Sequence, residues 1–294
     1  MTALKLLGQS LEYTPREVIT PDGLTIAAQD WGTAGQGRDL LFIHGYSQAG
    51  LCWMRQTCSA LSARARMVTY DLRGHGASDK PTERDRYRDP QFWADEVAAV
   101  IETLRLDRPV LVAWSYAGRV ALDYLTCRGS DTISALVMVS GTATSGEHVA
   151  GPAMADLRRM AEARDFGQNF AATRDFLARC VAEPVEQQVW ALMMAWNLAV
   201  PPWVRLAMGG RPADYDATLA ALDVPVLAIH GDCDEVNLLA MSEHVAQTCR
   251  DARLRVYENV GHIPFWEAPD RFNADLAAFI DGLPATPPSE AAKS

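Results

Sequence analysis

Three polar residues, Ser115, Asp234 and His262, have the types that nucleophilic catalysis requires, and each lies just past the end of a predicted strand. A serine hydroxyl needs a base to take its proton and a carboxylate to orient that base. Ser115 stands in PVLVAWSYAG, between a run of β-forming residues and a helical pattern, with an alanine two residues to either side. A sharp strand–turn–helix transition of this kind exposes the serine hydroxyl and points the next backbone N–H, that of Tyr116, toward the same place.

Asp234 and His262 occupy similar positions in the sequence. Asp234 ends VPVLAIHGDCD, an apolar strand pattern with a polar turn, and His262 lies in LRVYENVGHIP, a second strand pattern with a Gly-His loop. Because the carboxyl ends of parallel strands meet at one edge of a sheet, where ligands bind, we expect all three residues to lie there. Their predicted roles are nucleophile (Ser115), orienting acid (Asp234) and general base (His262). Asp232, in the same turn, competes with Asp234 for the role of the acid.

The segments that must position these residues alternate between strand and helix patterns. A turn signal at Pro21-Asp22-Gly23 separates two strand patterns. Expected strands lie at residues 16–20, 24–31, 39–43, 66–70 and 133–139, and expected helices at about 50–63 and 90–104. This order predicts an α/β fold, a doubly wound and mostly parallel sheet of about eight strands with helices on both faces.

The alternation stops between residues 144 and 211, where the sequence has helical patterns and no convincing strand. The expected helices are 153–163, 166–181, 185–198 and 203–208. This stretch is rich in Trp and Met, and methionine gives a binding wall that adapts to its ligand. The predicted substrate-binding residues are Trp190, Met193, Met194, Trp196, Trp203 and, outside this stretch, Phe265.

Five segments together resemble the α/β-hydrolase fold superfamily over roughly residues 15–283. They are LLFIHG followed by Tyr46, VTYDLRGHGASDKP, the Ser115 turn, GDCD and VGHIPFWEAPDRF. The nearest resemblance is to serine hydrolases of the esterase, haloperoxidase-like and C–C hydrolase type. Alanines replace both glycines that flank the serine in the usual G-x-S-x-G pattern, which is a departure from it.

The resemblance implies further roles. The backbone N–H of Tyr46 would join that of Tyr116 in an oxyanion hole, and the G-x-x-D spacing favours Asp234 as the acid. His44 and His75 would shape their loops. Residues 144–211 would form a helical cap over a core made of residues 1–143 and 212–283, and residues 284–294 would be a disordered tail.

Composition excludes several other classes. A net charge of −10 argues against nucleic-acid binding and an anionic membrane surface. The N-terminus lacks a secretory pattern, no apolar run approaches the ~20 residues of a membrane span, and the six cysteines show no CxxC spacing. We therefore expect a cytoplasmic protein with a small-molecule substrate, and exposed aromatic residues leave room for a homodimer. There is no GxGxxG, P-loop or HExxH motif, so no cofactor and no metal are expected.

The combined expectation is a serine hydrolase that cleaves a small apolar or aromatic carboxylic ester or lactone through an acyl-enzyme. Relatives that cleave halides or epoxides use an aspartate where this chain has Ser115. One alternative is a C–C bond hydrolase of a diketone-type substrate, whose carboxylate Arg119 would bind. Another is a cofactor-free perhydrolase, although such proteins usually have a proline soon after the oxyanion residue, where this chain has Ser47-Gln48. A third is a ligand-binding receptor on the same scaffold.

Overall fold

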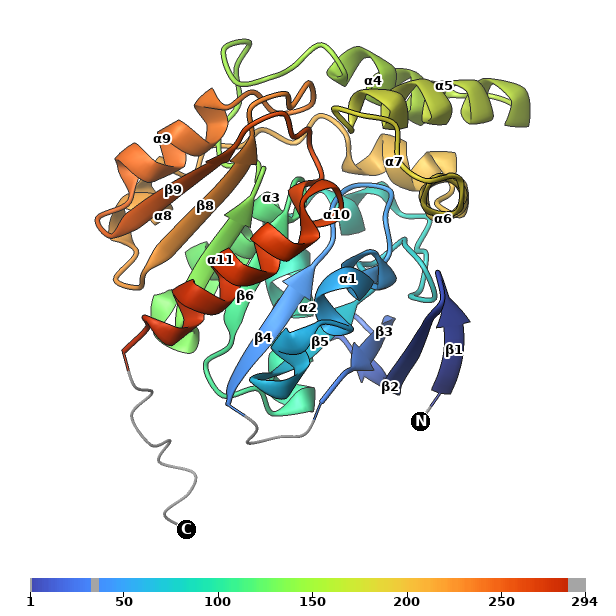
Figure 1. Cartoon of the computed structure of the whole chain (residues 1–294). Coiled ribbons are helices and arrows are strands. Elements are labelled where there is room, and N and C mark those ends of the chain that lie inside the picture. Colours follow the sequence, from blue (N-terminus) through green and yellow to red (C-terminus); the bar gives the residue numbers. More distant parts are fainter. Residues whose placement is uncertain (1, 33–36, 285–294) are drawn as a thin grey trace.

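The computed structural model describes residues 2–32 and 37–284, and within them nine strands form one sheet in the order β1-β2-β3-β5-β4-β6-β7-β8-β9 (Figure 1). The strands are β1 (Thr2–Leu6), β2 (Gln9–Ile19), β3 (Thr25–Asp30), β4 (Arg38–Ile43), β5 (Ala65–Tyr70), β6 (Val110–Trp114), β7 (Ala135–Val139), β8 (Val226–Gly231) and β9 (Ala252–Tyr257). From β5 to β9 all neighbours are parallel, whereas β1, β2 and β3 pair antiparallel. The predicted fold class is confirmed, with β1 added at one edge.

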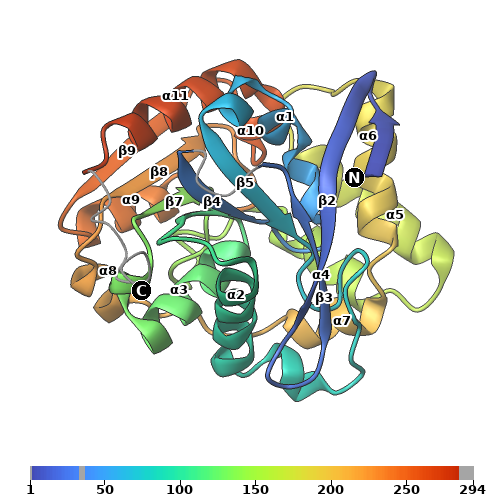
Figure 2. The ribbon, with the colours of Figure 1, turned by 90° about the horizontal axis from the view of Figure 1, so that it is seen from below.

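The central strands are buried along their whole length because helices cover both faces of the sheet. Alternate side chains of β4 enter different cores: Leu41 and Ile43 pack on one face, and Leu40 and Phe42 on the other. Helices α2 (Pro90–Leu104) and α3 (Ala117–Arg128) lie on the first face, and α1 (Met54–Thr57) and α11 (Pro269–Asp281) on the second (Figure 2). The remaining helices of the sheet layers are α8 (Asp216–Ala221), α9 (Ala240–Thr248) and α10 (Pro264–Glu267).

Two local predictions differ from the structure. The first strand of the hairpin begins at Gln9 instead of residue 16. The helix expected at residues 50–63 is broken into 3-10 turns at Gly50–Trp53 and Ala60–Ala63 around the short α1. The break has a local cause, because the Ser59 hydroxyl accepts a hydrogen bond from the Leu61 N–H and starts a new turn.

Between β7 and β8 the chain forms five helices, and the first four of them lie beyond the carboxyl ends of the central strands (Figure 1). These four are α4 (Met154–Glu162), α5 (Phe166–Arg179), α6 (Gln187–Leu198) and α7 (Pro202–Met208), here called the helical layer. These helices agree with the expected ones to within a few residues. The cap boundaries at 144 and 211 stay a prediction.

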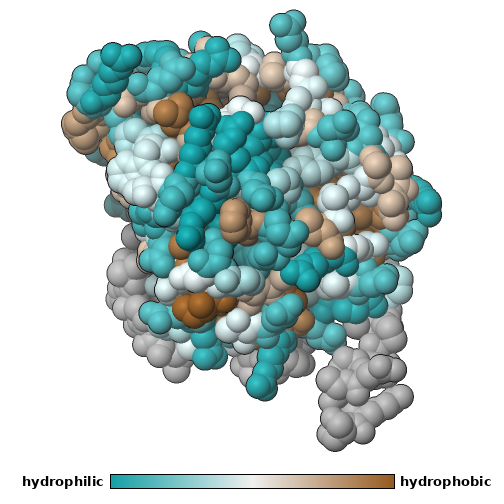
Figure 3. Space-filling view, turned by 180° about the vertical axis from the view of Figure 1, so that it is seen from behind, coloured by the Kyte–Doolittle hydropathy of each residue, from teal (hydrophilic) through white to brown (hydrophobic). Residues whose placement is uncertain are grey.

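The surface agrees with the charged composition. The face seen from behind is largely hydrophilic, with small and separate apolar patches (Figure 3). Among the described residues, no helix combines the length and apolar character needed to cross a bilayer. The predicted disordered tail lies, apart from residue 284, outside the described residues.

Candidate active site

Ser115 sits in a strained turn between β6 and α3. Its φ is +56°, in the left-handed region that non-glycine residues rarely adopt. The turn is fixed by the backbone, because the Ser115 N–H donates to Val139 O and the Ser115 carbonyl accepts from the N–H groups of Gly118 and Thr142, each at 2.9 Å. A Cβ at Gly118 would lie 2.7 Å from the Thr142 nitrogen. Gly118 is therefore the position at which α3 lies too close to the backbone of Thr142 for a side chain. The turn accommodates alanine at positions 113 and 117, where the usual pattern has glycine.

The three residues singled out by type and order lie in one hydrogen-bonded chain. His262 Nε2 lies 2.8 Å from Ser115 Oγ, and His262 Nδ1 lies 2.7 Å from Asp234 Oδ2. An ionised carboxylate only accepts, so Nδ1 carries the proton and the Nε2 lone pair faces the serine hydroxyl. All three side chains are buried. The arrangement can transfer a proton from Ser115 to His262.

Asp234 is held as an anion by its surroundings. Burial alone would raise the pKa of its carboxyl, but the facing rings of His262 and His230 and the N–H of Val236 lower that pKa below its usual value. Its second oxygen, Oδ1, accepts from the N–H groups of Val236 (2.8 Å) and Asn237 (3.0 Å). Asp232, the competing acid, is exposed and accepts instead from the Asn259 N–H at 2.7 Å.

The Tyr46 and Tyr116 N–H groups donate to no acceptor among the described residues, so both are available to a ligand. Two neutral histidines brace the loop that carries Tyr46. Burial lowers the pKa of His44 to about 4 and that of His75 to about 3. His44 accepts from the Leu72 N–H at 2.9 Å, and His75 accepts from the Ser47 N–H at 3.1 Å. Both imidazoles therefore fix the backbone beside Tyr46.

A buried arginine of the helical layer reaches the same loop. Arg205 is fully buried, and its guanidinium forms no ion pair with any described carboxylate. Its Nε donates to Ser47 Oγ at 2.9 Å, and its other nitrogens donate to Asn169 Oδ1 on α5 and the Asn197 carbonyl on α6. Burial lowers its pKa to about 10, so the side chain stays protonated at neutral pH. Arg205 therefore joins three helices of the layer to the residue after Tyr46.

Two chambers meet at Ser115. The first, here called the apolar chamber, is walled mainly by apolar side chains. Its walls include Phe176, Met193, Trp196, Phe265 and Trp266. The second, here called the arginine chamber, is lined by both polar and apolar residues. Its walls include Arg119, Thr142, Ser145, Arg211 and Asn237. Tyr46, Ser115 and Leu157 line both chambers.

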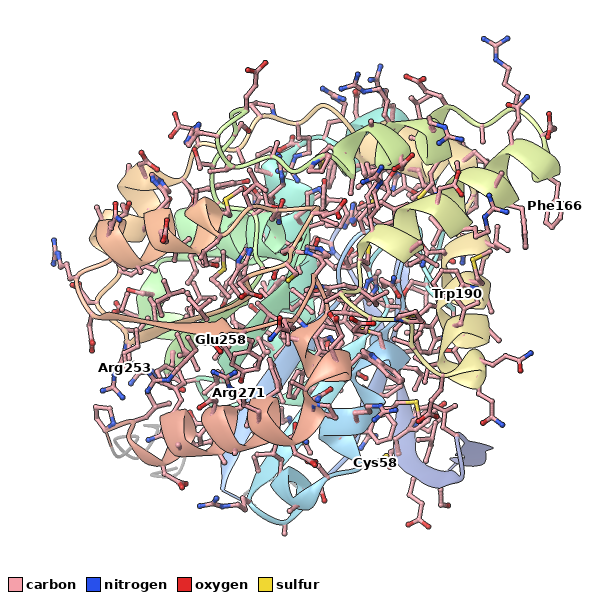
Figure 4. All side chains as sticks on the ribbon, turned by 45° about the horizontal axis from the view of Figure 1, so that its top comes forward. Cys58, Phe166, Trp190, Arg253, Glu258 and Arg271 are labelled. Atoms are coloured by element: carbon pink, nitrogen blue, oxygen red, sulfur yellow. The ribbon has the colours of Figure 1, made fainter. Side chains whose placement is uncertain are left out.

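The predicted substrate-binding residues divide into two groups. Met193, Trp196 and Phe265 line the apolar chamber. Trp190, Met194 and Trp203 line neither chamber, which corrects the expectation for these three. Trp190 lines a separate surface hollow beside the connection from α5 to α6 (Figure 4), and Trp203 is 50% exposed. Met194 points away because successive residues of a helix are turned by about 100°, which places it nearly opposite Trp196.

Most residues of the arginine chamber were not predicted from the sequence. Arg211 and Ser145 come from connecting segments with no periodic pattern, and Asn237 follows the Asp234 turn. The one available signal was the carboxyl end of β7, since Thr142 lies three residues beyond it. No group of three or more His, Cys, Asp or Glu side chains in the described part of the chain is arranged to hold a metal ion.

Comparisons with known proteins agree with this geometry. The model of the alpha/beta hydrolase family matches residues 40–275. An esterase from Rhodococcus sp. ECU1013 superposes with a TM-score of 0.85 at 30% identity, covering 92% of this chain and 99% of that one. A non-heme chloroperoxidase from Kitasatospora aureofaciens is 28% identical over 89% of this chain and 98% of its own length. A 2-hydroxymuconate semialdehyde hydrolase from Pseudomonas sp. (strain CF600) is 26% identical over 84% and 88%.

The chain therefore belongs to the alpha/beta hydrolase family. The family match covers most of the chain, including Ser115, Asp234 and His262. The similar proteins include esterases, haloperoxidases and a C–C hydrolase, so they support ester hydrolysis in general and no single substrate.

Proposed function

We propose that this protein is a serine hydrolase that cleaves small apolar or aromatic carboxylic esters or lactones through an acyl-enzyme. The observation that carries the proposal is the hydrogen-bonded chain from Ser115 through His262 to Asp234, which opens onto an apolar chamber. Its similarity to an esterase at 30% identity also supports it.

The proposed reaction follows from the positions of these groups. Ser115 Oγ attacks the acyl carbon while His262 Nε2 takes its proton, and Asp234 stabilises the imidazolium that forms. The N–H groups of Tyr46 and Tyr116 donate to the oxyanion. His262 then gives its proton to the leaving alcohol, and a water activated by the same imidazole cleaves the acyl-enzyme.

The test is turnover of p-nitrophenyl esters from acetate to decanoate, together with phenyl-substituted esters and lactones. We expect multiple turnovers with an optimum set by the apolar chamber, and a loss of at least roughly 10⁴-fold in kcat for Ser115→Ala. Equal rates for the wild type and Ser115→Ala would contradict the proposal. Binding without multiple turnover would favour a receptor.

Arg119 favours a second candidate, a C–C bond hydrolase, because it offers a cation near Ser115 for a substrate carboxylate. The two functions can be distinguished by the substrates that are turned over, since a C–C hydrolase would turn over vinylogous diketones and leave simple esters intact. A perhydrolase function is less well supported, because such proteins usually have a proline soon after the oxyanion residue. Ser47, the residue after Tyr46, has a φ of +59°, and a proline ring would hold φ near −65°.

A further inference from the structure

The arginine chamber has an unbalanced charge. Its lining includes two cations, Arg119 and Arg211, and no carboxylate. Arg211 is neutralised from behind, because its guanidinium pairs at 2.6 Å with the buried Asp123. The other Asp123 oxygen accepts from the Tyr215 hydroxyl, also at 2.6 Å. Asp123 therefore balances the positive charge of Arg211. The positive charge of Arg119 is left without an ion-pair partner among the described residues.

Arg119 makes few interactions of its own. Within the described residues its one hydrogen bond goes to the Arg211 carbonyl, and it forms no ion pair with a described carboxylate. Its guanidinium lies 5.9 Å from the centre of the Tyr116 ring. Partial burial lowers the pKa of Arg119, because its charged form has lost water. An anion placed beside it would recover that lost solvation.

The opposite wall can add neutral donors. Thr142 Oγ1 accepts from Asn237 at 3.1 Å, and Ser145 Oγ accepts from the Ala213 N–H at 2.8 Å. Each hydroxyl keeps its proton to donate, since no described group accepts from it. One guanidinium with neutral hydroxyls balances a single negative charge, which favours a carboxylate over a doubly charged phosphate.

We propose that the arginine chamber binds a carboxylate carried by one half of the substrate, with Arg119 as its partner, while the other half occupies the apolar chamber. The position fits, because Arg119 stands in the first turn of α3, four residues after Ser115. Arg119 and Ser115 also line the same chamber, so one bound molecule can present a carboxylate to Arg119 and a carbonyl to Ser115. This inference rests on the proposed serine hydrolase function and narrows its substrate class to acidic esters.

The test compares esters that differ only in charge. One pair carries the charge on the acyl half, monomethyl adipate and the methyl ester of adipic monoamide. The other carries it on the alcohol half, hexanoyloxyacetate and hexanoyloxyacetamide. We expect the wild type to prefer the carboxylate at least about tenfold in kcat/KM in one of the two pairs, as hydrogen bonds to charged groups usually allow.

Three variants separate the role of Arg119 from net charge and folding. Arg119→Gln should lose the preference, whereas Arg119→Lys should keep part of the preference. Arg128→Gln, an exposed cation of the same helix paired with Asp95, should keep all of it. A wild type without preference, or a preference that survives in Arg119→Gln, would overturn the inference.

A binding measurement keeps the inference distinct from the proposed function. Calorimetry on Ser115→Ala with the same four esters reports recognition without turnover. Tighter binding of a carboxylate ester, lost when Arg119→Gln is added, would support the inference even if no ester is hydrolysed. Equal binding of acid and amide, beside normal turnover of neutral esters, would overturn the inference and leave the hydrolase proposal intact.

Discussion

The two chambers that meet at Ser115 are built by different parts of the chain. Helices α5, α6 and α10 supply the apolar chamber through packed side chains such as Phe176, Trp196 and Phe265. Connecting segments, together with Arg119 on α3, supply most of the arginine chamber. Packed helices select by shape, since their side chains are held by neighbours, whereas loop hydroxyls and guanidinium groups select by charge. A substrate that occupies both chambers, as proposed, would therefore have each half recognised by a different physical means.

The groups between the chambers should behave differently from the walls. Tyr46 and Ser115 line both chambers, and His262 lines the apolar chamber. Asp234 and Arg205 line neither chamber and act through His262 and Ser47. Changes in this shared set should slow neutral and carboxylate esters by equal factors. Changes in one wall should alter the ratio between substrates.

The largest effect is expected at the acid. Asp234→Asn should lower kcat by roughly 10⁴-fold for both substrate classes, because an amide would stabilise the wrong tautomer of His262. Asp232→Asn is the matched control two residues away, and its activity should stay near wild type because the exposed Asp232 accepts from the Asn259 N–H, whereas His262 bonds Asp234. Steady-state kinetics decide the assignment, and a larger loss in Asp232→Asn than in Asp234→Asn would reverse it.

Arg205 should give the next effect. Arg205→Met removes the hydrogen bonds to Ser47, Asn169 and Asn197 but keeps an apolar side chain of similar length. Because Ser47 follows Tyr46, we expect kcat to fall by about 10- to 100-fold for both substrate classes, less than the loss of a whole oxyanion donor.

The free energy of unfolding provides the control for Arg205→Met. It should fall by roughly 1–3 kcal/mol for each buried acceptor on Ser47, Asn169 and Asn197 that loses its donor. A variant that unfolds more easily but keeps the wild-type kcat would show that Arg205 only holds the helical layer in place.

The sequence predicted the site residues that follow strands better than it predicted which side chains of a helix face the site. Ser115 and Asp234 each follow an apolar run typical of a buried strand, and His262 follows the alternating pattern of a strand at the sheet edge, so their approach at the carboxyl ends of the strands could be expected. Helix α6 gives no such guide, because QQVWALMMAWNL is apolar on every side and its period does not mark the inward face. For that reason Trp190 and Met194 could not be separated from Met193 and Trp196. The catalytic roles themselves stay predictions until the variants are measured.

The arginine chamber was harder to predict for a different reason. Thr142, Ser145 and Arg211 reach Ser115 from segments far apart in sequence, and no spacing rule connects them. Arg119 could be suspected from its place after the serine. The pairing of Arg211 with Asp123, which leaves Arg119 as the unbalanced cation, is visible only in three dimensions.

The smallest effect should come from one wall of the apolar chamber. Trp196→Ala enlarges that chamber, so the ratio of kcat/KM for bulky aryl esters to that for acetate should rise about tenfold, in the range that one or two methylene groups usually give. The preference for a carboxylate should not change, because Trp196 does not line the arginine chamber. Trp203→Ala removes a tryptophan from the neighbouring helix outside both chambers and should leave both ratios as they are. If Trp196→Ala altered the carboxylate preference as strongly as the size preference, the two chambers would act as one site, and the separation of shape from charge would fail.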